Sequence, residues 1–107
     1  MAKVIFILQR KSGTTREECL DRWAGERHTS IVCTLPGLTG WVQNHVVPAP
    51  AEPAACDGVG ELSFRDDELM QAALNSAEMA AAAEDAQNFL EMDTTGLVIV
   101  EENTIVA

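Results

Sequence analysis

Two short, uninterrupted apolar runs constrain the fold of this chain more than any other feature. They cover Val4–Leu8 (VIFIL) and Leu97–Val100 (LVIV). Such short β-favouring runs are typical of strands whose two faces are both at least partly covered. Only two helical regions lie between them, enough for one face of a sheet. We therefore expect the other face to pack on the sheet of a second copy, in a homodimer that buries about 1,200–2,000 Å².

The first helix is predicted by a start signal and a stop signal. Thr15-Arg16-Glu17-Glu18 has the capping-box pattern, with Thr14 and Glu17 as the alternative frame. The helix should run to about Cys33, because Pro36-Gly37 stops it.

The remaining elements are read from periodicity, helix propensity and proline content. We predict strands over Leu38–Val47, with a bulge near Gly40, and over Gly58–Phe64, separated by a proline-rich connector over Pro48–Ala55. Asp66-Asp67 is a helix start signal for a stretch that runs to about Leu74, and a second helical stretch runs from Ser76 or Ala77 to about Glu91. The order βαββαβ predicts the ferredoxin-like α+β fold, a four-stranded antiparallel sheet with both helical regions on one face. We expect a single domain over residues 1–107.

Charge and cysteine content narrow the function classes. The formal net charge is −10, from 7 Lys and Arg against 17 Asp and Glu, which disfavours nucleic acid and anionic membrane surfaces as partners. Val4–Leu8 is too short to span a membrane and lacks a signal-cleavage pattern. The cysteines, which have no metal-ligand spacing, predict a reduced, cytoplasmic protein without a metal site: Cys19, Cys33 and Cys56.

His28 is the candidate catalytic residue. At four-residue spacing it shares a row of the first helix with Leu20, Ala24 and Val32, which places it at the edge of the buried face. The alternative is a structural histidine at this boundary, bonded to backbone or water. An imidazole there suits a general base, because histidine titrates near neutral pH.

Two charged residues are candidates to accompany His28. Arg27 falls near the centre of the apolar stripe and would need a carboxylate or a ligand anion if buried, unless the helix loosens near Gly25 and releases it to solvent. Asp85 shares a helix face with Phe89 and could orient His28 or pair with Arg27, the alternative being an exposed acid.

Strand periodicity sorts a second group of candidates. Trp41, Gln43 and His45 share one face of their strand, whereas Asn44 lies on the other. Trp41 could line an apolar pocket, and Asn44 could bind a ligand or hold a turn. The alternative is that Trp41 belongs to the core and that Asn44 and His45 are ordinary surface residues.

Four stretches of the chain, in order, resemble the EthD family of dimeric α/β-barrel proteins. They contain the Trp-x4-His spacing of Trp23 and His28, the LPGL turn, the VQNH run and the GVGELSF strand. The resemblance implies a homodimer, a pocket for a small hydrophobic organic molecule and no metal or organic cofactor. His28 matches the family's recurrent candidate catalytic histidine. Around it we expect a set of substrate-binding residues: Trp23, Arg27, Trp41, Asn44, Asp85 and Phe89.

Two departures from the family pattern limit the chemistry. Trp41 stands where the family often has Tyr, and the chain has no Tyr at all. The third predicted strand has no Cys, which argues against an isomerase that relies on a strand cysteine.

The resemblance favours a cofactor-independent lyase or isomerase. Such an enzyme would dehydrate, cyclise, decarboxylate or isomerise a hydrophobic carbonyl compound, with His28 as base and Asn44 or Arg27 binding the developing oxygen charge. One alternative is a non-catalytic accessory protein of an oxygenase-based degradation system. Another is a monooxygenase, suggested only by the shared barrel.

Overall fold

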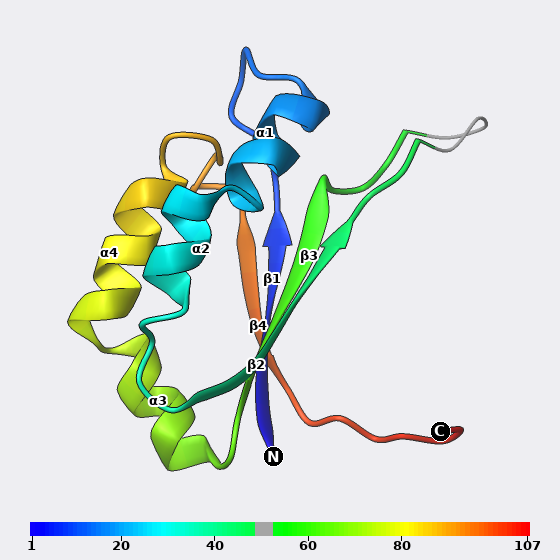
Figure 1. Ribbon diagram of the computed structural model, residues 1–107. Coiled ribbons are helices and arrows are strands. Elements are labelled where there is room, and N and C mark those ends of the chain that lie inside the picture. The colour runs from blue at the N-terminus through cyan, green and yellow to red at the C-terminus, as the bar shows by residue number, and fades with distance from the viewer. Residues whose placement is uncertain (49–52) are drawn as a thin grey trace.

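The computed structural model describes residues 1–48 and 53–107 (Figure 1). The elements follow in the order β1 (Ala2–Leu8), α1 (Arg16–Trp23), α2 (Glu26–Val32), β2 (Leu38–His45), β3 (Gly58–Phe64), α3 (Asp67–Leu74), α4 (Ala77–Ala86) and β4 (Gly96–Val100). The predicted connector over Pro48–Ala55 lies partly outside the described residues, and its described ends carry neither helix nor strand.

The four strands form one sheet in the order β2-β3-β1-β4, with every neighbouring pair antiparallel. The helices lie together on one side of this sheet, and its other face is left open (Figure 1). This confirms the predicted ferredoxin-like α+β fold. The predicted irregularity near Gly40 is also present, because the register of β2 against β3 shifts between Leu38 and Gly40.

The first predicted helix is two helices, which corrects the expectation of one helix from Thr15 to Cys33. Gly25 has extended backbone angles (φ −68°, ψ 155°) and stands between α1 and α2 as the N-cap of α2. Glycine weakens a helix interior by roughly 1 kcal/mol relative to alanine, so the chain can bend here at little cost. The predicted start is confirmed: the Thr15 side chain accepts a hydrogen bond from the backbone N–H of Glu18.

The last helical region also ends earlier than predicted. Ser76 caps α4, but the helix stops at Ala86 instead of continuing to about Glu91. The backbone N–H of Phe89 donates to the Ala86 carbonyl in the turn that follows, and Leu90 forms a bridge with Arg10 beside β1. This bridge to the segment after β1 therefore replaces the last helical turn, and Phe89 beside it lies in the core.

Alternation along β1 divides its side chains between the two faces of the sheet. Val4 pairs with Leu62 on β3, and both are buried beneath the helices. Ile5 lies opposite Val98 on β4 and therefore faces the open side with it. Val98 is 44% exposed, and Val42, from β2, is 52% exposed. The open face thus carries exposed aliphatic side chains.

Asp57 ties the start of α1 to the sheet. This residue is buried just before β3, and its carboxylate accepts hydrogen bonds from the backbone N–H and the guanidinium of Arg10 and from Nε of Arg16. The contacts hold the end of β1 and the first turn of α1 in one position.

Within the described ranges, no helix is long and apolar enough to cross a membrane.

A close approach of α1 to β3 gives a stability prediction. A Cβ atom added at Gly58 would lie 2.8 Å from Cζ3 of Trp23, too close without a shift of the ring. We expect Gly58→Ala to lower the free energy of unfolding by about 1–3 kcal/mol through overpacking. Gly40→Ala is the matched control, because its Cβ would meet Ser63 at an ordinary 3.7 Å. Urea denaturation measures both, and equal effects would contradict the prediction.

Candidate functional site

A cavity of about 100 Å³ lies between the sheet and the helices. Aromatic side chains line it from the sheet and from α1, and α4 contributes a row of alanines. The small side chains on α4 leave this space unfilled, because larger residues there would complete the core. The residues that shape the cavity most are Phe6, Trp23, Trp41, Ala82, Ala83 and Ala86.

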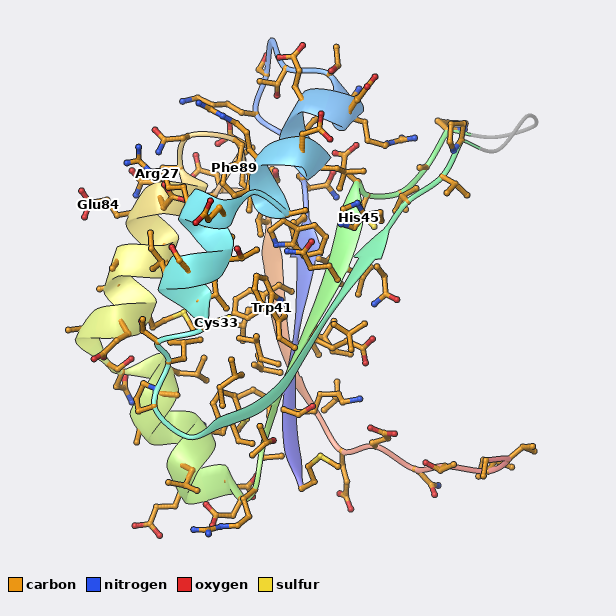
Figure 2. The ribbon with its side chains drawn as sticks, in the orientation of Figure 1. Arg27, Cys33, Trp41, His45, Glu84 and Phe89 are labelled. Atoms are coloured by element: carbon orange, nitrogen blue, oxygen red, sulfur yellow. The ribbon has the colours of Figure 1, made fainter. Side chains whose placement is uncertain are left out.

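His28 provides the titratable group of this cavity. It lies in the first turn of α2 and is 6% exposed. Its ring packs edge-on against Phe89, with centroids 5.1 Å apart, and against Trp41 at 6.4 Å. Figure 2 shows Trp41 pointing from the sheet toward the helix layer, with Phe89 near the upper end of that layer. His28 and Trp41 line the cavity, whereas Phe89, expected to bind substrate, packs against the His28 ring without lining the cavity.

Asp85 determines which nitrogen of His28 faces the cavity. Its Oδ2 lies 3.0 Å from Nδ1 of His28, and a carboxylate can only accept, so Nδ1 carries the proton when the ring is neutral. Nε2 has no hydrogen-bond partner among the described residues. Every fully buried side-chain nitrogen or oxygen of the described residues has a hydrogen-bond partner, so Nε2, which has none, is not fully buried. The basic nitrogen is therefore accessible from the cavity.

Burial keeps the imidazole neutral near physiological pH. Desolvation lowers the pKa of His28 below its usual 6.5, and the hydrogen bond and charge of Asp85 only partly oppose this effect. A neutral imidazole whose other nitrogen is held by a carboxylate is the arrangement that a general base requires.

Arg27 reaches the same carboxylate from the other side. Its Nε lies 2.9 Å from Oδ1 of Asp85, while its side chain is 84% exposed. Figure 2 shows Arg27 at the outer surface of the helix layer. The expected substrate-binding role is corrected: the break at Gly25 turns the guanidinium to solvent, and Arg27 pairs with Asp85 instead of entering the cavity. Asp85, in contrast, is buried.

Asn44 lies away from the cavity, which corrects its assignment to substrate binding. Its amide donates to the Val59 carbonyl at 3.0 Å and to Oε2 of Glu61 at 2.9 Å. Asn44 pairs with Val59 across β2 and β3, so its side chain lies on the open face with those of Val59 and Glu61. The cavity therefore lacks the amide that was expected to bind an oxygen charge.

Trp23 is buried and forms one wall of the cavity. Its indole lies against Gly58 and Gly60 of β3, where an added Cβ atom would come within 2.8 Å and 3.0 Å of the ring. His45 stacks on the indole with centroids 5.2 Å apart, and Gln43 donates a hydrogen bond to the Trp23 carbonyl. His45 thus supports the wall without lining the cavity.

Sequence reasoning missed two features of the cavity. The first is the alanine row at 82, 83 and 86, whose helical spacing in an alanine-rich stretch is a detectable signal. The second is Thr95, which lines the cavity with Met92 from the loop before β4 and has no periodic pattern to reveal it.

Other reactive groups add nothing to this site. Burial raises the pKa of the Cys19 thiol to about 11, so it stays protonated and unreactive. All three cysteines are free. Over residues 1–48 and 53–107, no three potential metal ligands gather in one place.

Fold and cavity together define a ferredoxin-like α+β protein with one histidine in an apolar pocket. A family model for the EthD domain matches residues 11–93. The chain belongs to the EthD family. No curated protein sequence matches it.

Solved structures share the fold over almost the whole chain. An ethyl tert-butyl ether d (EthD) family protein from Bacillus halodurans has a TM-score of 0.76 at 22% identity, covering 96% of this chain and 100% of that one. An Arabidopsis thaliana protein has a TM-score of 0.74 at 11% identity, with 100% of both chains covered. A dimeric ferredoxin-like protein of unknown function from Bacteroides fragilis has a TM-score of 0.68 at 14% identity, covering 94% of this chain and 95% of that one.

The lowered pKa of His28 predicts a pH-dependent stability. Unfolding releases the imidazole to its usual pKa near 6.5, so between this value and the folded pKa the unfolded chain binds more protons. We expect part of the free energy of unfolding to be lost as the pH falls through about 6.5. His28→Asn, which keeps a donor for Asp85 and cannot titrate, should remove this part of the loss.

Urea denaturation of both proteins at about pH 7.5 and about pH 5.5 measures the difference, and carboxyl groups cancel in the comparison. An equal loss in both proteins would contradict a depressed His28 pKa.

Proposed function

We propose that the chain is a cofactor-independent enzyme of the lyase or isomerase type, in which His28 is the general base. The observation that carries this proposal is the pair formed by His28 and Asp85: Nδ1 is held at 3.0 Å by the carboxylate while Nε2 is left free in an apolar cavity. Asp85 would stabilise the imidazolium that forms when Nε2 takes a proton. The EthD fold provides the context, and the chemistry rests on this site.

One base in the cavity favours reactions that begin and end with the same proton. Nε2 would take a proton from carbon next to a carbonyl, breaking the C–H bond and forming N–H. The imidazolium would then return that proton to another carbon, completing an isomerisation, or to a leaving hydroxyl, completing a dehydration. Neither step needs a second titratable side chain.

The lining indicates the substrate class. Among residues 1–48 and 53–107, no Lys or Arg side chain lines the cavity, and Arg27 points to solvent, so a carboxylate or phosphate would find no Lys or Arg partner there. Its volume of about 100 Å³ is about two-thirds that of an engineered cavity of about 150 Å³ that binds benzene. A small neutral carbonyl compound, no larger than one ring, fits these properties, which favours isomerisation or dehydration over decarboxylation.

A binding role without catalysis is the second candidate. It is favoured by the same observation that limits the chemistry: in the part of the chain that the structure describes, no second acid or base and no amide donor such as Asn44 lines the cavity. In that case the pocket would hold an organic compound for an oxygenase-based system, in the cytoplasm as the charge and free cysteines suggest.

We also propose a homodimer formed through the open sheet face. Ile5, Ile7 and Val59 face that side and are only partly buried in one copy. The Bacteroides fragilis relative is dimeric. Burial of such a face releases about 25 cal/mol per Å² of apolar surface, which supports association of two chains despite their negative charge.

Turnover by His28 variants tests the catalytic role. Native mass spectrometry of the chain purified from a lysate identifies a retained organic compound, which then serves as the substrate. We expect His28→Asn to retain this compound and to lower its turnover by about 10²–10⁴-fold, because the base is lost while the cavity remains. His45→Asn removes the stacking on the Trp23 wall but leaves the base in place, so it should lower turnover far less than His28→Asn does.

Unchanged turnover by His28→Asn would remove His28 as the base. A retained compound that the unaltered chain does not convert would instead support the binding role.

Filling the cavity tests its use as a binding site. Ala83→Leu extends a side chain from α4 into the space, whereas Ala81→Leu makes the same change at an exposed position of α4. We expect phenol and toluene, followed by NMR chemical-shift changes, to bind at least about tenfold more weakly to Ala83→Leu and normally to Ala81→Leu. Phenol should bind more tightly than toluene, because its hydroxyl can donate to Nε2 of His28. Equal binding by the two variants would contradict the assignment.

A further inference from the structure

The segment Glu101–Ala107, which follows β4, is exposed to solvent along its length. All seven residues are exposed and carry no helix or strand. Ile105 is 82% exposed and Val106 is 86% exposed. Figure 1 shows the segment leaving the sheet on the side opposite the helices. Two adjacent aliphatic side chains are thus presented to solvent on the side of the open face.

One ion pair fixes the direction in which this segment leaves. Glu102 Oε2 lies 2.6 Å from Nζ of Lys3 on β1. Lys3 pairs with Ser63 and Val100, so its side chain is on the open face, where it also contacts Glu61 at 3.0 Å. The contact therefore directs the segment outward on the side of the open face and away from α3 and α4.

The length of the segment shows what it can reach. Packed sheets lie about 10 Å apart. From Val100 to Ile105 is five residues, or about 17 Å of extended chain. Ile105 and Val106 can therefore reach beyond the plane of a sheet packed on the open face.

We infer that Ile105 and Val106 pack on the partner subunit of the homodimer, so that each copy holds the other with its residues 101–107. The inference rests on the proposed dimer and adds a second contact to it, outside the sheet faces. The partner is a second copy of this chain, because the segment emerges on the face where that copy packs. Contact with its own open face is the alternative that the experiment must separate.

A mixed dimer distinguishes contacts between copies from contacts within one copy. Full-length chain labelled with ¹³C is mixed with unlabelled chain, and isotope-filtered nuclear Overhauser spectra are recorded. We expect cross-peaks from the labelled methyl groups of Ile105 and Val106 to protons of the unlabelled copy. Their absence in a sample that sediments as a dimer would overturn the inference and leave the sheet-face dimer standing.

Substitution measures the contribution of the contact. The double variant Ile105→Ser with Val106→Ser should raise the dimer dissociation constant at least about tenfold, because four aliphatic side chains per dimer lose their burial. The double variant Asn103→Ser with Thr104→Ser alters polar residues of the same segment and should leave the constant unchanged. An equal constant for both variants overturns the inference, whereas an unaltered chain that sediments as a monomer overturns the proposed dimer with it.

Discussion

The buried carboxylate of Asp85 is the contact on which the site depends. One oxygen accepts from Arg27 at 2.9 Å and the other faces Nδ1 of His28 at 3.0 Å, so a single side chain of α4 binds two consecutive residues of α2. A buried carboxylate is costly without partners, and these two neighbours satisfy it. The carboxylate therefore contacts an exposed guanidinium on one side and a buried imidazole, which lines the cavity, on the other. The tautomer of His28, the contact of α2 with α4 and the accessibility of Nε2 from the cavity all follow from this position.

The fold could be predicted from the sequence because its signals were strong and local. Val4–Leu8 and Gly58–Phe64 read as strands from composition and alternation, and Thr15 and Ser76 announced helix starts. The break at Gly25 was less visible, since glycine tolerates both a helical and an extended backbone and only packing decides between them. That undecided bend is what left the direction of Arg27 open.

The site was predictable only where one element determined it. His28 was placed correctly on a buried helix face because its four-residue spacing to Val32 lies within α2, which the break at Gly25 leaves intact. Strand alternation had already separated Asn44 from Trp41, and the structure follows the alternation and not the expected ligand role. The burial of Asp85 depends on how α4 packs on α2, a contact between distant segments that spacing within one helix cannot show. For the same reason, the spacing of the alanine row could indicate a face of small side chains on α4, but not that the neighbouring elements leave a cavity there.

The strand β1 separates two environments, the cavity on one face of the sheet and the open side on the other. Phe6 and Leu8 border the cavity, whereas Ile5 and Ile7, which alternate with them, face the open side of the sheet. Each side chain of the VIFIL run is therefore constrained either by the core and cavity or by the open side of the sheet. A substitution that shifts the backbone to suit the cavity also displaces the side chains on the opposite face. We therefore expect β1 to tolerate the fewest substitutions. Substitutions that adapt the cavity to a larger or smaller ligand are more easily accommodated on α4, whose outer face is exposed to solvent.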